Sequence, residues 1–143
     1  MEAFSEEWSQ ACCARLNSRE RFRSVGGRWD SPVVLVMKAD PGRGLPEARS
    51  VFLDLYRGEC RQARVATQED FERAEFVLAA PPTTWRRMLR GEQDPITAVM
   101  FGRLKLEKGS LPALMPYAAA ARELVAAAAE VPADLPGAAA GPG

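Results

Sequence analysis

Residues 94–115 read DPITAVMFGRLKLEKGSLPALM. Signals for a helix, a strand, a turn and a second helix follow one another within this short stretch, which makes it the most informative part of the chain. Asp94 is placed to cap a helix, and Pro95 stands at the first helical position, where a missing N–H costs nothing. Gly102 is a helix-stop residue. The stretch contains no histidine, no cysteine and only two carboxylates. It therefore predicts ordered structure with little reactive chemistry.

A strand and a second helix complete this stretch. Residues 103–108 alternate apolar and polar side chains, which predicts a short strand. Gly109 turns the chain, and Ser110 is placed to cap the last helix. Pro116 predicts a kink or a restart in that helix, because its ring clashes with the carbonyl four residues back. The alanine-rich run that follows has high helix propensity and extends the helix to about residue 130.

Upstream, the sequence predicts one helix followed by four strands. Ser5 is placed to cap the opening helix, which extends over residues 5–23. The strands are expected at residues 31–39, 49–58, 60–66 and 76–80. The short link at residues 57–59 predicts an antiparallel hairpin, which argues against a doubly wound nucleotide-binding sheet.

Local composition sets the remaining boundaries. Residues 67–75 are expected to form a polar connection or a short helix, and Thr83 or Thr84 to cap the next helix. The segment 131–143, VPADLPGAAAGPG, has too little apolar content to stay ordered. The sequence thus predicts one domain over residues 1–130 and a disordered C-terminal tail over residues 131–143.

Composition narrows the class of protein. The 143 residues are 47% apolar and 27% charged, as in a globular domain, and 19 basic residues balance 19 acidic ones. This balance removes the electrostatic reason to expect nucleic acid or an anionic membrane as the main partner. The chain has no histidine, which excludes Ser–His, Cys–His and His–metal sites within it. The acidic N-terminus lacks a secretory pattern, and no apolar run approaches the ~20 residues of a membrane span. A cytoplasmic protein without a cofactor is expected.

The three cysteines, Cys12, Cys13 and Cys60, have no CxxC spacing that would suggest zinc or a redox pair. Reduced thiols are the simplest account for a cytosolic protein. The sharper alternative is a thiol nucleophile at Cys60 or Cys12, with Arg61 or Arg15 lowering its pKa. Arg61 and Arg15 are better explained as solvent-facing residues, and the chain has no histidine to act as the base that a thiol nucleophile needs.

Two groups of charged residues have alternative interpretations. Asp54 and Asp94 could form a pair of catalytic carboxylates, but Asp94 already fits as a helix cap and Asp54 lies on the polar side of a strand. Arg86, Arg87 and Arg90 form a basic helix face that could recognise a lipid head group, a CoA phosphate or a membrane surface. A solvated helix face is the commoner use of such a triplet and is preferred.

Residues 76–115 carry a string of features in a fixed order. They are Trp85, Gly91, Asp94–Pro95, Ala98, Met100, Gly102–Arg103–Leu104 and Lys108–Gly109. In this order they resemble the type-two sterol-carrier-protein family. Two positions depart from that family's pattern. Ser110 stands where the family usually has Asp, and Glu75 stands where Asp is common; the first keeps a helix cap and the second keeps the charge.

The resemblance implies an α+β fold, with a five-stranded, mostly antiparallel sheet covered by helices and an apolar tunnel between them. It also implies a non-catalytic protein that binds sterols, fatty acids, acyl-CoAs or phospholipids and is suited to transfer them. The lipid-binding residues are then expected among the apolar positions of the second half: Trp85, Met88, Leu89, Ile96, Val99, Met100, Leu104, Leu106, Leu114, Met115 and Ala118. By periodicity alone, each of them also fits an ordinary packed core.

Two functions stay open at this point. In the first, the partner is a lipid or another apolar small molecule, with no nucleic acid and at most transient membrane contact. In the alternative, the same fold is a protein-interaction or oligomerisation module, such as a homodimer, whose tunnel is filled by side chains such as Phe101 and Tyr117. A fold shared with lipid carriers does not separate the two.

Overall fold

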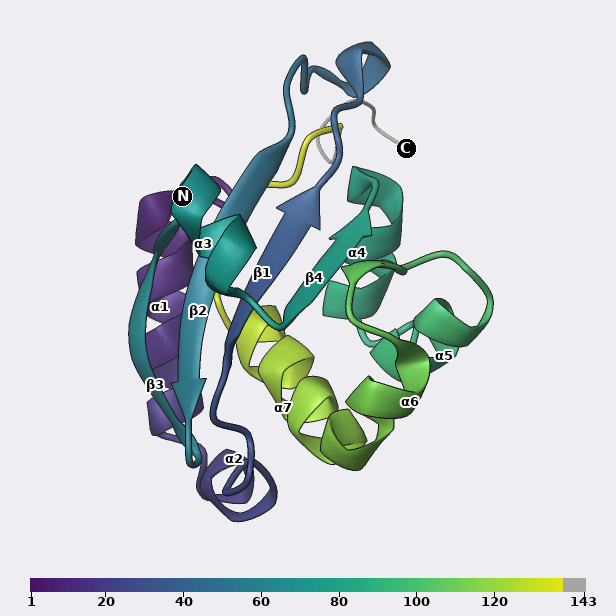
Figure 1. The fold of residues 1–143 in the computed structure, drawn as a ribbon. Coiled ribbons are helices and arrows are strands. Elements are labelled where there is room, and N and C mark those ends of the chain that lie inside the picture. The colour runs from purple at the N-terminus through teal and green to yellow at the C-terminus, as the bar shows by residue number, and fades with distance from the viewer. Residues whose placement is uncertain (138–143) are drawn as a thin grey trace.

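A five-stranded sheet forms the centre of the computed structural model, which describes residues 1–137 (Figure 1). Its strands are β1 Pro32–Met37, β2 Arg49–Tyr56, β3 Glu59–Val65, β4 Phe76–Ala80 and β5 Lys105–Lys108. They lie side by side in the order β3-β2-β1-β4-β5. β1 and β4 are parallel, and the other three neighbouring pairs are antiparallel. The predicted five-stranded, mostly antiparallel sheet is confirmed.

The strand sequences explain this arrangement. β1 lies at the centre of the sheet, and its apolar run VVLVM is buried on both faces. β2 alternates instead: Leu53 and Leu55 face the main core, whereas Phe52 faces a smaller apolar cluster on the other side. The predicted hairpin joins β2 to β3 through Arg57 and Gly58, whose φ angles of 49° and 85° suit a tight two-residue turn.

Helices cover both faces of the sheet. They are α1 Glu6–Asn17, α2 Glu20–Val25, α3 Gln68–Arg73, α4 Pro82–Leu89, α5 Pro95–Met100, α6 Leu111–Leu114 and α7 Ala118–Ala129. α1 and α7 pack together on the main core, and α3 covers the smaller cluster on the opposite face (Figure 1). The single opening helix predicted for residues 5–23 is divided at Ser18 and Arg19 into α1 and α2. Short 3₁₀ turns occur at Pro41–Arg43 and Met115–Tyr117.

Helix caps follow the sequence in most places. The N–H of Thr97 donates to the Asp94 carboxylate at 2.9 Å at the start of α5. Ser110 caps α6 in the same way, and Pro116 lies in the 3₁₀ turn that separates α6 from α7. These three predictions are confirmed.

The cap predicted at Thr83 or Thr84 is wrong. α4 begins at Pro82, with Pro81 as the N-cap residue and no side-chain cap. Pro82 fits the first helical position because its fixed φ angle is already helical. The helix therefore starts before the two threonines, which lie inside its first turn.

Residues 67–75 adopt the helical alternative, as α3. Thr67 and Asp70 form a reciprocal capping box at its start. Asp70 is buried, and the Arg64 guanidinium donates two hydrogen bonds to its carboxylate, at 3.1 and 2.6 Å. Burial opposes ionisation of Asp70, but the hydrogen bonds from Arg64 and Thr67 outweigh it and lower the pKa of the carboxyl below its ordinary value.

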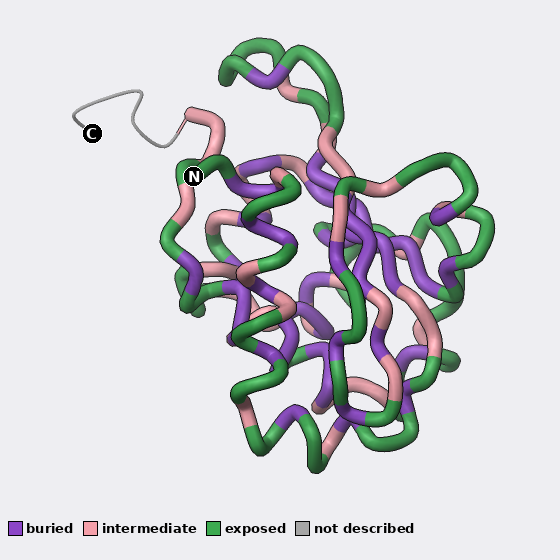
Figure 2. The backbone as a smooth tube through the Cα atoms, turned by 90° about the vertical axis from the view of Figure 1, so that its left-hand side faces the viewer, coloured by how far each residue is buried: buried purple, intermediate pink, exposed green. Residues whose placement is uncertain are grey.

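Large aromatic side chains occupy the layer between the sheet and the helices. Trp8, Trp29 and Trp85 are each almost fully buried there. The indole Nε1 of Trp85 donates to the carbonyl of Val36 at 2.9 Å, which ties α4 to the sheet. Tyr117 stacks on Trp29 with 5.4 Å between the ring centroids. In Figure 2, the buried residues follow the central strands and the inward sides of the helices.

The cysteines correct one sequence prediction. Cys13 of α1 and Cys60 of β3 form a disulfide, with their Cα atoms 5.3 Å apart, although both were expected to be reduced. The side chain of Asn17 joins the same two elements. Its amide nitrogen donates to the carbonyl of Cys60, and its amide oxygen accepts from the N–H of Cys60. Cys12 is free and buried, and burial raises the pKa of its thiol to about 12. Neither Cys60 nor Cys12 thus offers the ready thiolate that a nucleophile needs.

The chain after α7 folds back onto the N-terminus. Val131 is buried, and Asp134 exchanges backbone hydrogen bonds with Met1 and Ala3 at 2.8 and 3.0 Å. Val131 and Asp134, in the segment that was expected to be a disordered tail, therefore contact the rest of the chain. Residues 138–143 of that segment lie outside the described residues. Within residues 1–137, no helix has the length and apolar character required to cross a membrane.

Candidate functional site

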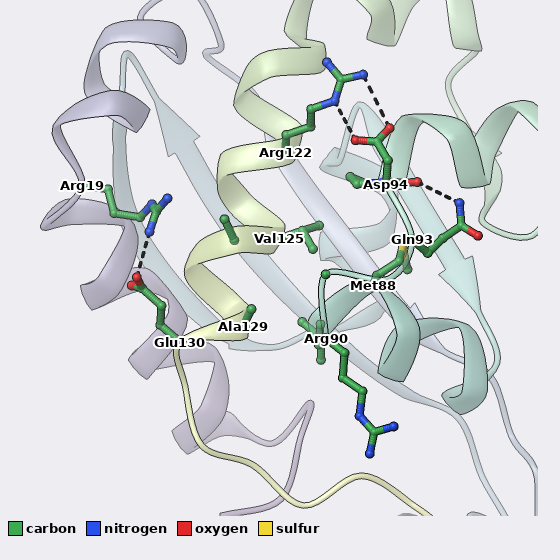
Figure 3. Close-up of a pocket in the computed structure, with 13 residues that line it drawn as sticks. Arg19, Met88, Arg90, Gln93, Asp94, Arg122, Val125, Ala129 and Glu130 are labelled. Atoms are coloured by element: carbon green, nitrogen blue, oxygen red, sulfur yellow. Dashed lines mark hydrogen bonds and ion pairs between the residues drawn. The ribbon is translucent and has the colours of Figure 1, made fainter.

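A pocket of about 520 Å³ lies between α4, the α4–α5 loop and α7 (Figure 3). The face that α7 turns toward it consists of Arg122, Val125, Ala126, Ala129 and Glu130. These positions recur at i, i+3, i+4, i+7 and i+8, so they form one stripe along the helix. The stripe extends from residue 122 to residue 130, and these eight steps correspond to ~12 Å at a rise of 1.5 Å per residue. We call this space the α7 groove.

The opposite wall of the α7 groove comes from the end of α4 and the loop that follows. Met88 and Leu89 contribute apolar side chains from α4, and Pro95 contributes one from the start of α5. The loop between them turns at Gly91, whose φ angle of 75° is in the left-handed region that favours glycine. The Asp94 cap then fixes where α5 begins. Apolar walls on both sides give the groove the character of a site for an apolar ligand.

An ion pair lies at each end of the stripe on α7. Nε of Arg122 is 2.7 Å from the Asp94 carboxylate, and Nη1 of Arg19 is 2.9 Å from the Glu130 carboxylate (Figure 3). Arg19 also binds Glu123 at 3.0 Å. The charged groups at the two ends therefore largely neutralise each other, which leaves an apolar middle section lined by Val125 and the alanines.

The Asp94 carboxyl has a lowered pKa. Burial raises it, but the hydrogen bonds from Arg122 and from Thr97 together outweigh that effect. Asp94 therefore stays ionised and holds α5 against α7 at the edge of the groove. Asp54, the other member of the carboxylate pair considered from sequence, binds Arg61 at 3.1 Å instead. The two aspartates thus have separate arginine partners.

The structure places the sequence-predicted lipid-binding residues in several environments. Met88 and Leu89 line the α7 groove, and Met88 is also buried in the main core. Four others are buried in the main core: Trp85, Ile96, Leu104 and Leu114. Three are half-buried against that core: Val99, Leu106 and Ala118. The last two, Met100 and Met115, are exposed at 62% and 48%.

Sequence reasoning missed the residues of α7 that line the groove. Val125 fitted the apolar stripe of the last helix but was not predicted as a ligand contact, and Ala126 and Ala129 were treated only as part of a strongly helical run. A signal was present, because small side chains follow one stripe of the helix between two charged residues, Arg122 and Glu130. Small residues on one face of a helix leave space beside it when the neighbouring helix does not approach closely.

The groove supplies apolar surface and paired charges. Its two carboxylates, Asp94 and Glu130, are both bound to arginines. Among residues 1–137, no three or more His, Cys, Asp or Glu side chains gather in a way that could hold a metal ion. The arrangement is suited to holding an apolar molecule rather than to moving protons.

Comparison with known proteins places the fold. A family model described as the SCP-2 sterol transfer family matches residues 12–122. A crystal structure of sterol carrier protein 2 is 40% identical, with a TM-score of 0.83 over 92% of this chain and 100% of that chain. The solution structure of a conserved hypothetical protein from Thermus thermophilus is also 40% identical, with a TM-score of 0.82 over 94% of this chain and 92% of that one.

A more distant structure shows the fold alone. The apo form of sterol carrier protein 2 from Yarrowia lipolytica is 18% identical, with a TM-score of 0.58 over 85% of this chain and 89% of that chain. The comparison with curated proteins gives no match. The family model covers most of the chain and the fold agrees, so this protein belongs to the SCP-2 sterol transfer family.

Proposed function

We propose that this protein binds lipids, such as a sterol, fatty acid, acyl-CoA or phospholipid, without transforming them, and that the ligand lies in the α7 groove. The observation that carries the proposal is the apolar stripe of α7 facing Met88 and Leu89 across a pocket of about 520 Å³. That volume falls within the range of roughly 300–1,000 Å³ that is typical of small-molecule sites. Membership of the SCP-2 sterol transfer family supports the same class of ligand.

The driving force would be removal of hydrocarbon from water. Each methylene group that enters the groove contributes roughly 0.8 kcal/mol. An apolar wall discriminates weakly between chains that differ by one methylene, so the protein should accept several related lipids. Of the residues predicted from sequence, this proposal retains Met88 and Leu89 as ligand contacts. It assigns the buried ones that do not line the groove, such as Trp85 and Leu114, to packing of the core.

The test fills the groove without disturbing the core. Ala129 is exposed and lines the groove, so Ala129→Trp should place an indole where the ligand would lie. Ala14 is also exposed on a helix but does not line the groove, which makes Ala14→Trp the matched control. Uptake of a fluorescent fatty-acid analogue should weaken about tenfold or more in the first variant, equivalent to about 1.4 kcal/mol or more. It should be unchanged in the second.

Identification of a natural ligand is a separate measurement. Native mass spectrometry of the purified protein, followed by solvent extraction, should release a lipid. If the wild-type protein carries no lipid and takes up no analogue, or if both tryptophan variants bind the analogue as the wild type does, the groove is not the binding site.

A second candidate function rests on a different observation. Met100 and Phe101, at the end of α5, are 62% and 71% exposed, and so large an exposed apolar pair often marks a contact surface. In this candidate the protein is an interaction or oligomerisation module. A clean apo mass, no uptake of the analogue and a concentration-dependent dimer abolished by Phe101→Ser would favour it.

A further inference from the structure

A second pocket, of about 290 Å³, adjoins the α7 groove. The two spaces share Leu89, Arg90 and Ala129 in their walls, so they meet at the end of α4. The rest of the second pocket is formed by Arg86 and by five apolar residues from the end of α7 and the segment that turns back toward the N-terminus: Ala128, Val131, Pro132, Ala133 and Leu135. A ligand longer than the groove could therefore extend past Leu89 into this second space.

The charge of the second pocket differs from that of the groove. Its lining contains two arginines, Arg86 and Arg90, and no aspartate or glutamate. Neither arginine forms an ion pair within residues 1–137. Arg90 is shared with the groove, whose other two arginines, Arg19 and Arg122, are both bound to carboxylates. The two carboxylates next to these lining residues in the chain have other partners: Glu130 is bound to Arg19, and Asp134 is 3.9 Å from the N-terminal amine.

Arg86 has an unsatisfied donor. Its Nε is buried and has no hydrogen-bond partner in the part of the chain that the structure describes. Its Nη2 donates to the carbonyl of Pro136 at 3.0 Å, which holds the guanidinium in place beside the pocket. A buried N–H without an acceptor is unfavourable, so a ligand oxygen that accepted from it would be favoured.

Arg90 is placed to act with Arg86. In Figure 3 its side chain points away from Met88 and Val125, out of the α7 groove. It nevertheless lines the second pocket, as the C-cap residue of α4, one turn after Arg86. Two guanidinium groups at one site suit an oxyanion, because each presents a planar set of N–H donors to its oxygens.

We propose that the second pocket binds the oxyanion head group of a single-chain amphiphile whose hydrocarbon tail lies in the α7 groove. Arg86 and Arg90 bind the head group, and Leu89 and Ala129 line the junction where the tail begins. This inference rests on the proposed lipid-binding function and adds a charge requirement to it. The ligand is then an acyl or alkyl chain that ends in a phosphate or carboxylate, rather than a neutral lipid.

The test compares head groups on one tail. Isothermal titration calorimetry with dodecyl phosphate, dodecanol and inorganic phosphate separates the anion from the chain. Dodecyl phosphate should bind more tightly than dodecanol, and inorganic phosphate alone should bind weakly. Arg90→Gln should weaken dodecyl phosphate about tenfold and leave dodecanol unchanged. Arg86→Gln should act in the same direction, with circular dichroism confirming that it folds.

The control is the neighbouring arginine of the same helix. Arg87 is exposed and lines neither pocket, so Arg87→Gln removes the same charge without touching the site. If Arg87→Gln weakens dodecyl phosphate as much as Arg90→Gln does, the effect is general electrostatics and the head-group site is wrong. If dodecanol and dodecyl phosphate bind equally and Arg90→Gln changes neither, the head-group site is also wrong, while lipid binding stands.

Two further outcomes concern the ligand itself. If inorganic phosphate binds as tightly as dodecyl phosphate, the pocket is an anion site that is unrelated to the groove, and the inference is overturned. If neither dodecyl compound binds, the proposed function fails together with it.

Discussion

Asp94 joins helix formation to the shape of the α7 groove, and its two roles can be separated by substitution. Its carboxylate accepts the N–H of Thr97 at 2.9 Å, which caps α5, and the Arg122 guanidinium at 2.7 Å, which holds α5 to α7. Asp94→Ala removes both interactions. Asp94→Asn keeps an oxygen for the cap but loses the charge, and Arg122→Gln removes only the ion pair.

The magnitudes follow from geometry and exposure. Loss of an N-cap side chain lowers the free energy of unfolding by about 0.5–2 kcal/mol. The ion pair joins side chains that are 51% and 34% exposed, so solvent screening limits it to about 0.2–1 kcal/mol. Asp94→Ala should therefore destabilise the protein by about 1–3 kcal/mol, and Asp94→Asn and Arg122→Gln by about 0.2–1 kcal/mol each.

Urea denaturation followed by tryptophan fluorescence measures these differences directly, because three tryptophans lie in the core. A thermal scan should show Tm falling by roughly 2–4 °C for each kcal/mol. Combining Arg122→Gln with Asp94→Asn should add little, since both remove the same pair. Equal stabilities for Asp94→Ala and Asp94→Asn would refute the cap assignment. Additive losses in the double variant would refute the ion pair.

Three other predictions concern Asp70, the Cys13–Cys60 disulfide and Trp85. The pKa of Asp70 in the folded protein lies below its ordinary value of 3.8, so its contribution to stability is present above that value and is lost as the pH falls through the folded pKa. Urea titrations down to about pH 3 should show a shallower acid dependence for Asp70→Asn than for the wild type. The Cys13–Cys60 disulfide closes a loop of 47 residues, so dithiothreitol or Cys13→Ser should lower the free energy of unfolding by roughly 2–4 kcal/mol. If reduction leaves the urea midpoint of the wild type unchanged, the bridge is not formed in solution. Trp85→Phe removes the donor to the Val36 carbonyl together with part of a buried ring and should cost about 1–3 kcal/mol by urea denaturation, so an unchanged urea midpoint would refute that bond.

Local signals in the sequence located most elements of the fold. Asp94 with Pro95, and Ser110 after Gly109, mark helix starts that the structure confirms, because a cap depends only on residues within one turn. The wrong cap prediction at Thr83 or Thr84 is also a local matter. Proline and threonine can both mark a helix start, they lie within three residues of each other here, and Pro82 determines where α4 begins. The apolar pattern of residues 5–23 contains no signal near Ser18 that would predict the division between α1 and α2.

The site was harder to predict, because it depends on which helices meet. Periodicity identified Leu104 and Leu114 as apolar, but it could not distinguish a side chain buried in the core from one that lines a groove. The disulfide between Cys13 and Cys60 was not predicted, because it also depends on which elements meet. The hairpin after β2 brings together residues that are 47 positions apart in the sequence. Met100 fitted the apolar stripe of α5 but lies on its exposed side.

The alanines of α7 show how one composition can serve both the fold and the groove. Ala120 and Ala127 are fully buried where α7 packs on the rest of the core, and a larger side chain there would overpack it. Ala126 and Ala129 line the groove, where a larger side chain would occupy free volume instead. The same substitution, Ala to Leu, should therefore lower stability at Ala127 and lower ligand affinity at Ala126. Because the helix propensities are equal, any difference between the two variants reports packing alone.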